Sequence, residues 1–311
     1  MTGVSVVIPA RDAADGVERV LQALRNQDWG GDWEVVVVDD GSTDSTAEVA
    51  RAGGARVVSN PSPLGPGDAR NAGVEAAGAP LIAFTDADCV PAPGWLRAGV
   101  AALEHADLVQ GRVDPDPATP PGPFDHTINV QEETLLYETA NLFVRREWFE
   151  RAGGFRAPEF IDPARGHFGE DILFAWAARR AGARSAFAPD AVVLHDVVRR
   201  PASAWIHERR RLRYFPLITR QVPELRARYV LGLFLSKRTA RFDAALAAVV
   251  VALATRTPWL LAAALPYLAT AFHRGPLTRS LLKTNAALLA GDAVAFAALA
   301  AGSVRSGTPV L

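Results

Sequence analysis

Short apolar runs alternate with helical patterns over the first 90 residues, and this alternation limits the possible folds more than any other feature. Val4 to Ile8, Trp33 to Val38 and Pro80 to Phe84 have the length and composition of buried strands. Segments with helical periodicity lie between them. Strands that alternate with helices indicate a parallel, doubly wound sheet, which binds ligands beyond the carboxyl ends of its strands.

An Asp-x-Asp pair follows the last of these three runs. Asp86 and Asp88 are two residues apart, so both carboxylates face the same side of an extended chain. That arrangement suits a divalent cation that holds a diphosphate. A solvated loop with two acids is the alternative interpretation.

A second acidic group, Asp39-Asp40-Gly41-Ser42, follows the strand that ends at Val38. A carboxylate there can accept the imide N–H of a uracil while Gly41 allows a tight turn, and capping of the next helix is the other interpretation. Neither the strand nor the turn contains a Gly-x-Gly-x-x-Gly loop, and the chain has no Gly-x-x-x-x-Gly-Lys-Ser/Thr loop. Without a cradle of backbone amides, a metal ion held by Asp86 and Asp88 is the expected counter-charge for phosphate.

The later part of the domain gives weaker signals. Residues 114–125 carry five prolines and are expected to form a loop. Helices are predicted at 146–152 and 171–181, and short strands at 186–187 and 192–194, before His195. A turn is expected at Pro9-Ala10-Arg11, after the first strand.

Composition restricts the compartment and the size of the fold. The 311 residues can hold one large domain and an appendage. The lone cysteine, Cys89, excludes an internal disulfide framework, and it is expected to be a small buried residue in a reducing cytoplasm. No basic region followed by an apolar region precedes the first strand, so we expect no signal peptide.

Charge is segregated along the chain, although the net charge is −1. Residues 1–195 hold 16 Lys and Arg against 29 Asp and Glu, net −13, whereas residues 196–241 hold 12 against 3, net +9. Apolar stretches follow at 244–254, 258–272 and 286–304, each near or below the roughly 20 residues that cross a bilayer. A basic block beside apolar helices favours an anionic membrane surface, with a soluble helical subdomain or a nucleic-acid partner as alternatives.

An ordered set of motifs over residues 4–195 resembles the inverting glycosyltransferases of family 2, which have the GT-A fold. The matching segments, in order, are Val6-Val7-Ile8-Pro9, Asp39-Asp40-Gly41-Ser42-Thr43-Asp44, Ala69-Arg70-Asn71, Asp86-Ala87-Asp88, Asn141-Leu142-Phe143-Val144-Arg145-Arg146, Gly153-Gly154-Phe155, Gly169-Glu170-Asp171 and Pro189-Asp190-Ala191-Val192-Val193-Leu194-His195. The resemblance implies a mixed, mostly parallel sheet with a helical, apolar C-terminal appendage. It divides the chain into a catalytic domain at 1–200, a basic helical linker at 201–243 and an apolar tail at 244–311.

The resemblance also implies roles for individual residues. Those of the nucleotide site would be Pro9, Ala10 and Asp12 at the nucleoside, Asp40 at the uracil, Arg70 near the diphosphate and Asp86 by the ribose and metal. Asp88 would be the direct ligand of Mn²⁺ or Mg²⁺, and His195 would complete the metal site. Asp171 would be the catalytic base, although a helix start also explains its position. Contacts with the acceptor or diphosphate would come from Asn141, Glu170, Arg209, Arg210 and Arg211.

We therefore expect a metal-dependent inverting transferase that moves one sugar from a nucleotide-diphosphate donor, a UDP-sugar, to a lipid-linked or cell-envelope glycan. The absence of a Gln-x-x-Arg-Trp signature favours a single addition over processive synthesis. Membrane association is expected at the cytoplasmic face, and the acidic first part of the chain argues against nucleic acid. Two alternatives stay open: transfer to a polyprenyl phosphate, and a non-catalytic sugar-nucleotide or membrane-binding scaffold.

Overall fold

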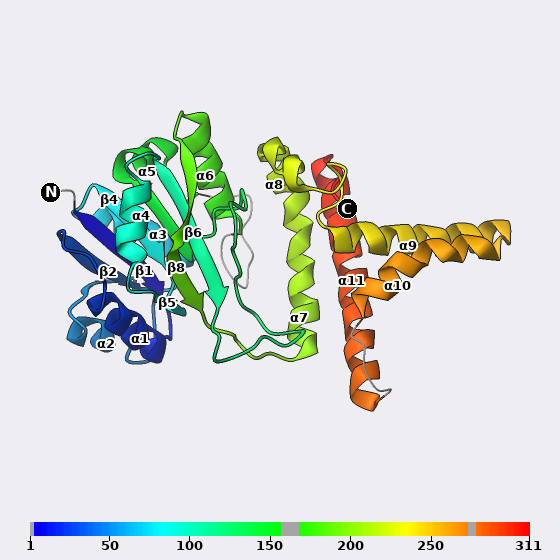
Figure 1. The fold of residues 1–311 in the computed structure, drawn as a ribbon, viewed down its shortest axis with the longest axis horizontal. Helices are drawn as coiled ribbons and strands as arrows, with labels where there is room; N and C mark the ends of the chain where they lie inside the picture. The colour runs from blue at the N-terminus through cyan, green and yellow to red at the C-terminus, as the bar shows by residue number, and fades with distance from the viewer. Residues whose placement is uncertain (1–2, 157–167, 273–277) are drawn as a thin grey trace. The chain divides into compact units, whose positions relative to one another are not determined.

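A mixed sheet forms the centre of the first of two units, which comprises residues 1–121 and 126–198 (Figure 1). The computed structural model describes residues 3–156, 168–272 and 278–311. Within them, the strands are β1 (Val4–Ala10), β2 (Trp33–Asp39), β3 (Arg56–Ser59), β4 (Leu81–Thr85), β5 (Cys89–Pro91), β6 (Leu108–Pro115), β7 (Asn141–Arg145) and β8 (Ser185–His195). Their order in the sheet is β3-β2-β1-β4-β7-β6-β8-β5.

The sheet is parallel through its first half and mixed in its second. Strands β3, β2, β1 and β4 run parallel, β7 pairs antiparallel with β4 and β6, β8 is parallel to β6, and β5 is antiparallel to β8. The predicted α/β fold class is confirmed. Strand β8 is one continuous strand where two short ones were expected.

Helices cover both faces of this sheet. They are α1 (Ala14–Arg25), α2 (Thr46–Ala52), α3 (Pro66–Ala76), α4 (Trp95–Ala102), α5 (Arg146–Ala152) and α6 (Glu170–Arg180). Val6 and Ile8 point to the main core, which contains α1 and α4, while Val7 lies against Gly73 of α3. Burial of alternating strand residues on opposite faces is what an apolar run requires when helices cover both sides.

The prediction of a turn at Pro9-Ala10 is wrong, because both residues belong to β1 and pair with Val38 and Asp39. The Ala10 carbonyl accepts the Asp40 N–H on the β2 side, so the backbone of Pro9 faces the other side, where pairing with β4 ends at Val7. The missing proline N–H therefore removes no ladder hydrogen bond.

The second unit, residues 122–125 and 199–311, is helical. Its elements are α7 (Ala202–Glu208), η2 (Arg209–Tyr214), α8 (Phe215–Gln221), η3 (Pro223–Arg228), α9 (Lys237–Thr255), η4 (Pro258–Ala264), α10 (Leu265–Ala271) and α11 (Arg279–Ser306). Among the described residues, α11 has the length and apolar composition that would allow it to cross a membrane. One face of α11 packs within the unit against α7, η2 and α8.

Candidate active site

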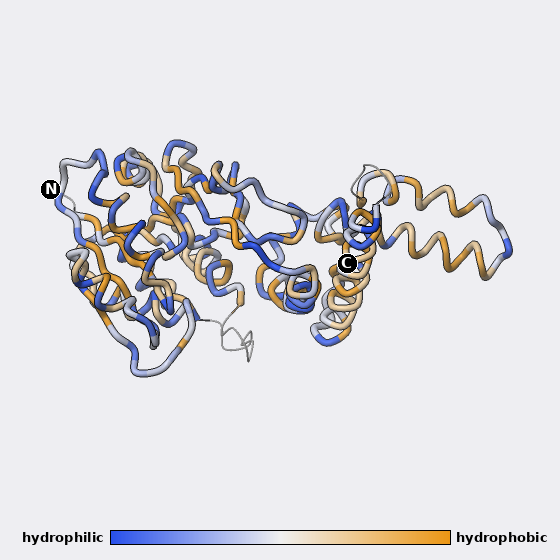
Figure 2. Tube along the Cα trace, turned by 90° about the horizontal axis from the view of Figure 1, so that it is seen from below, coloured by the Kyte–Doolittle hydropathy of each residue, from blue (hydrophilic) through white to orange (hydrophobic). Residues whose placement is uncertain are grey.

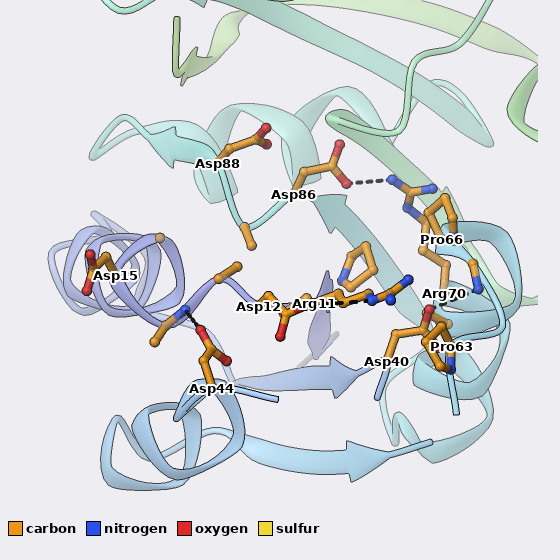
Figure 3. Close-up of a pocket in the computed structure, with 18 of the residues that line it drawn as sticks. Arg11, Asp12, Asp15, Asp40, Asp44, Pro63, Pro66, Arg70, Asp86 and Asp88 are labelled. Carbon is orange, nitrogen blue, oxygen red and sulfur yellow. Dashed lines mark hydrogen bonds and ion pairs between the residues drawn. The ribbon is translucent and has the colours of Figure 1, made fainter. Parts of the chain in front are cut away.

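An acidic cleft of about 990 Å³ lies at the carboxyl ends of β1, β2 and β4 (Figure 3). It is lined by residues 9–16 and Arg19, Asp40 and Asp44, residues 63–66, Ala69 and Arg70, residues 86–88, and Asp196. Seven of the lining side chains are aspartates and three are arginines. This is the edge at which doubly wound sheets bind ligands, and its negative charge favours a cation over a bare phosphate.

Asp12 fastens the loop after β1 to the loop after β2. Its carboxylate accepts hydrogen bonds from the backbone N–H of Thr43 at 2.7 Å and the Thr43 hydroxyl at 3.0 Å. These two bonds lower the pKa of the Asp12 carboxyl. Asp44 in turn accepts a hydrogen bond from the N–H of Ala14, at the start of α1. The two loops therefore form one connected wall of the cleft.

Asp40 organises the opposite wall. Its carboxylate accepts hydrogen bonds from Asn60 Nδ2 at 2.7 Å and from the N–H groups of Leu64 and Gly65, each at 2.9 Å. A carboxylate has about four acceptor positions, so one position is left after these three bonds. The segment that holds Asp40 needs Gly41, whose φ is +73° and at which a Cβ would lie 2.9 Å from Pro63.

Arg70 connects this cleft to α6. Its Nη2 lies 2.5 Å from Asp86 Oδ1, and its Nη1 lies 3.8 Å from Glu170 Oε1. Burial alone would lower the pKa of Arg70, but the Asp86 and Glu170 carboxylates outweigh it and raise that pKa. The neighbouring Asn71 exchanges two hydrogen bonds with the backbone of Phe155, so the Ala-Arg-Asn and Gly-Gly-Phe motifs meet in space.

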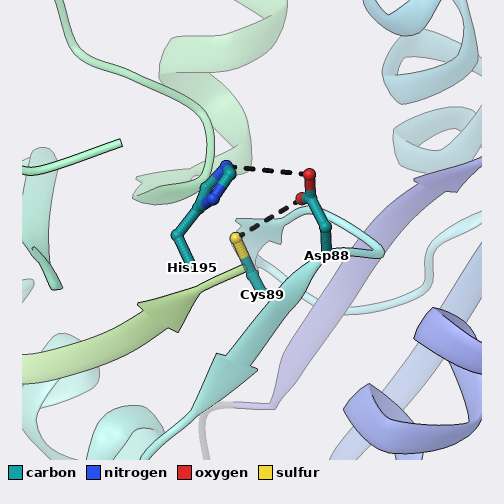
Figure 4. Close-up of side chains that lie close together, drawn as sticks. All are labelled: Asp88, Cys89 and His195. Atoms are coloured by element: carbon teal, nitrogen blue, oxygen red, sulfur yellow. Dashed lines mark hydrogen bonds and ion pairs between the residues drawn. The ribbon is translucent and has the colours of Figure 1, made fainter. Parts of the chain in front are cut away.

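Asp88 and His195 meet because β5 pairs antiparallel with β8, which places Cys89 opposite His195 (Figure 4). His195 Nε2 lies 3.7 Å from Asp88 Oδ2, and the ligand atoms of Asp88, Cys89 and His195 all lie within 4.8 Å of one another. His195 Nδ1 lies 2.7 Å from the Asp196 carbonyl. Donation of Nδ1–H to that carbonyl leaves the Nε2 lone pair directed at Asp88.

The chemistry of these three groups fits a hard cation held by oxygen and nitrogen. Burial, and then the charge of Asp86, raise the pKa of Asp88. Burial also raises the pKa of the Cys89 thiol well above its ordinary value, with smaller contributions from Asp86 and Asp88. Cys89 is therefore a neutral thiol, and the carboxylate and imidazole are the groups that suit Mn²⁺ or Mg²⁺.

Asp171 occupies the first turn of α6, beside Glu170. Burial, followed by the charges of Glu170 and Glu138, raises the pKa of Asp171 well above its ordinary value. Its Oδ1 accepts a 2.8 Å hydrogen bond from the Ile172 N–H. A carboxylate with a raised pKa is a better proton acceptor, which is what a general base requires.

The other predicted acceptor-site residues lie elsewhere. Asn141 is fully buried between strands, where its side chain bonds Trp95 Nε1 and the carbonyls of Arg112 and Ala191. Arg209, Arg210 and Arg211 lie in η2 of the second unit. Arg209 stacks on Trp205 with its guanidinium carbon 4.2 Å from the ring centre. Contacts of these arginines with a diphosphate or acceptor stay a prediction.

Several cleft residues were missed by the sequence analysis, among them Arg11, Asp15, Arg19 and Asp196. Arg19 and Asp196 form an ion pair between α1 and the end of β8. Asp196 follows His195 directly, and that adjacency is the signal that could have identified it. Arg19 carried no signal, because one exposed arginine on a helix resembles any other.

The sheet and its acidic cleft define a protein of the GT-A fold. The model of the family described as "Glycosyl transferase family 2" matches residues 5–157. The Haloferax volcanii protein "Glycosyltransferase AglE" is 32% identical over 208 residues, which cover 62% of this chain and 66% of that one. "Pre-mycofactocin glycosyltransferase" of Mycobacterium tuberculosis is 29% identical over 215 residues, covering 62% of this chain and 42% of that one. The matching family model, the curated relatives and the shared fold together support a family 2 glycosyltransferase.

Solved structures agree on the fold. The mannosyltransferase PcManGT of Pyrobaculum calidifontis, in complex with GDP-Man and Mn²⁺, has a TM-score of 0.59 and 22% identity, over 97% of this chain and 86% of that one. S. aureus TarS 1–349 in complex with UDP-GlcNAc has a TM-score of 0.52 and 20% identity, over 70% and 66%. Of the two curated relatives, the chain covers 66% of the length of AglE and 42% of the length of the pre-mycofactocin glycosyltransferase.

Proposed function

We propose that this chain transfers one sugar from a UDP-sugar to an acceptor hydroxyl, with inversion at the anomeric carbon. The observation that carries the proposal is the convergence of Asp40, Arg70, Asp86 and Asp88 on one acidic cleft, with Arg70 bridging to the α6 turn that holds Asp171. A scaffold that only binds nucleotides has no need for an additional buried carboxylate with a raised pKa.

The donor is a nucleotide-diphosphate sugar in this proposal. Among solved proteins of the same fold, TarS is in complex with UDP-GlcNAc and PcManGT with GDP-Man. Asp40 supports a uracil base here, because three hydrogen bonds leave its carboxylate one acceptor position for an imide N–H.

Asp88 and His195 would hold Mn²⁺ or Mg²⁺, with Asp86 beside them. When bound, such an ion neutralises charge that develops on a leaving diphosphate. Asp86 is already paired with Arg70, so its carboxylate orients that guanidinium at the edge of the cleft. Cys89 stays a neutral thiol below the pair and fills space.

Asp171 would take the proton from the acceptor hydroxyl as that oxygen attacks the anomeric carbon. The new C–O bond forms on the side opposite the departing diphosphate, so a single displacement inverts the configuration. Burial among Glu170 and Glu138 makes the Asp171 carboxylate a stronger base than a solvated aspartate.

The acceptor we propose is a lipid-linked or cell-envelope glycan at the cytoplasmic face of the membrane. The support is the charge pattern, in which the basic block 196–241 precedes the apolar stretches. An anionic polyprenyl phosphate is the rival acceptor, and it differs in needing no base.

The test is release of free nucleotide from UDP-, GDP- and dTDP-sugars, with bacterial or archaeal membranes as acceptor source and with Mn²⁺ or EDTA. We expect release from a UDP-sugar that EDTA abolishes. Asp171→Asn should lower turnover by about 10²- to 10⁴-fold while nucleotide affinity is kept. Asp190→Asn, an exposed aspartate on β8, is the matched control.

Three outcomes decide the proposal. Nucleotide binding without release from any donor would favour the scaffold. If Asp171→Asn kept full activity with a lipid phosphate as acceptor, the acceptor would be that phosphate and not a hydroxyl group. A product that retains the donor's anomeric configuration would exclude the direct displacement.

A further inference from the structure

Two antiparallel segments of the second unit form an apolar hairpin, which we define as residues 244–271. Its first arm is the greater part of α9, and its second arm is η4 with α10. Arg256, in the turn between the arms, is the single charged residue of this segment. Figure 2 shows both arms as predominantly hydrophobic and the turn between them as hydrophilic.

The hairpin exposes its apolar side chains. Val250, Leu253, Trp259 and Leu265 are 57%, 75%, 72% and 60% exposed. The exposed residues of α9 between Ala244 and Thr255 are all Ala, Val or Leu, so this arm has no polar face. An amphipathic helix that lies on a membrane surface needs a polar face, whereas a helix that is apolar all round belongs inside a protein or a bilayer.

The base of the hairpin is fixed and polar. Arg238 forms a bidentate ion pair with Asp292 at 2.7 and 2.8 Å, and the Tyr267 hydroxyl donates to the same carboxylate at 2.7 Å. The Phe242 ring packs on Tyr267 with 5.3 Å between ring centres. The arms therefore project from an anchored base, and their exposed apolar surface is not the frayed end of a helix.

Helix α11 is the competing candidate, since its length and composition would let it span. Its buried residues recur every three or four positions and form one stripe, which includes Leu288, Gly291, Asp292 and Leu299. A Cβ on Gly291 would lie 2.0 Å from the Trp205 ring, and one on Gly302 would lie 2.2 Å from the Arg213 carbonyl oxygen. This close fit makes α11 the core helix of the second unit.

We propose that the apolar hairpin inserts its two arms into one leaflet of a lipid bilayer, and that α11 stays outside the bilayer. The twelve residues Ala244–Thr255 extend about 18 Å at 1.5 Å per residue, less than the roughly 30 Å of a hydrocarbon core, so the hairpin enters from one face. Lys237 and Arg241 lie at its base, where anionic headgroups would meet them. This inference refines the membrane location in the proposed function.

The experiment is flotation of the full chain with vesicles of phosphatidylcholine and phosphatidylglycerol, without donor or acceptor. Leu253→Glu and Leu261→Glu place a charge on each arm of the hairpin at exposed positions. Leu282→Glu and Val304→Glu place the same charge at positions of α11 that are 56% and 84% exposed. Circular dichroism and thermal unfolding confirm that all four variants fold.

We expect the hairpin variants to lose at least tenfold in vesicle affinity and the α11 variants to bind as the unchanged protein does. Trp259 fluorescence, taken as the difference from Trp259→Phe, should be quenched by lipids brominated on their acyl chains. Loss of binding in the α11 variants, or none in the hairpin variants, overturns the proposal. A dimer that forms without lipid and is broken by Leu253→Glu, together with no flotation, would assign the hairpin to a second copy of the chain. None of these readouts depends on turnover, so they separate this inference from the proposed activity.

Discussion

Asp171 lies where ionisation is unfavourable, and this placement affects the stability of the fold. Burial and two neighbouring carboxylates raise its pKa in the folded state, whereas in the unfolded chain it returns to the ordinary range. The folded state therefore binds the proton more tightly. Stability from this group is fully present below the unfolded pKa and is lost as the pH rises through the folded pKa.

Asp171→Asn should for that reason stabilise the protein at neutral pH while it removes activity. We expect an increase in Tm of roughly 2–4 °C at pH 7, the shift that about 1 kcal/mol produces in a unit of the size that holds Asp171. The increase should disappear below about pH 3.9, where the unfolded aspartate is protonated as well. Differential scanning calorimetry in EDTA at several pH values measures it, and an increase that is independent of pH would contradict the assigned cause.

The three groups at the β5–β8 pair should contribute unequally to metal binding. Asp88→Asn and His195→Gln are expected to weaken Mn²⁺ binding by more than about tenfold, since each removes a ligand that suits this ion. Cys89→Ala should leave the affinity unchanged, because the thiol is buried and neutral. Isothermal titration with MnCl₂ distinguishes them. Equal loss in all three variants would make Cys89 a thiolate ligand.

Sequence reasoning identified the acidic residues of the cleft because strand ends and acid spacing are local signals. Asp40, Asp86 and Asp88 were chosen in this way and line one cleft. The hydrogen-bond partners of these residues could not be predicted from the sequence, because only the fold brings the two segments together. The loop at Leu64 and Gly65 carries no acidic or basic signal, yet its backbone N–H groups donate two of the three hydrogen bonds that the Asp40 carboxylate accepts.

The shape of the turn after β2 depends on one glycine. Gly41 has a φ of +73°, and a Cβ there would lie 2.9 Å from Pro63. Gly54 has a φ of +85° but no atom within 4 Å of its would-be Cβ. The two positions share the backbone strain and differ in the contact.

Gly41→Ala should therefore cost more than Gly54→Ala. We expect about 1 kcal/mol from the left-handed backbone at either position, and a further loss at Gly41 from the clash. Because Pro63 lines the cleft, Gly41→Ala should also weaken nucleotide binding, whereas Gly54→Ala should not. Urea unfolding and nucleotide titration measure the two effects. If both variants lost the same unfolding free energy, the loop that holds Pro63 would move away from the added Cβ at no cost in stability.

Elements were predictable from sequence where an apolar run was long and uninterrupted. β1, β2 and β4 satisfied that condition, and the helix at 146–152 was predicted with its observed bounds. β5 has three residues and ends in proline, so no periodicity marks it. β8 was divided in two because Pro189-Asp190 interrupts its apolar pattern. The structure accommodates this interruption as an irregularity of β8, because Ala188 pairs with Gly111 and Val192 with the next residue of β6, Arg112.

Charge segregation acts at the scale of the whole molecule. The net charge of −13 over residues 1–195 should repel an anionic surface, while the +9 of residues 196–241 should attract it. Vesicle binding of the full chain should therefore weaken at least tenfold when phosphatidylglycerol is replaced by phosphatidylcholine, or when the salt is raised from about 0.05 to 0.5 M. Sedimentation at each condition tests this. If vesicle binding were unaffected by either change, charge would play no part and the apolar hairpin alone would account for membrane binding.

The place of β8 in the sheet bears on how the protein matures during synthesis. This strand is the last of the described sheet to be made, yet it lies between β6 and β5. Until the ribosome has released it, Asp88 has no His195 opposite and β5 has no neighbour in the sheet. A nascent chain that stops before residue 185 would carry the acidic loops without the imidazole, so the metal site proposed at Asp88 and His195 can form only after β8 has been made.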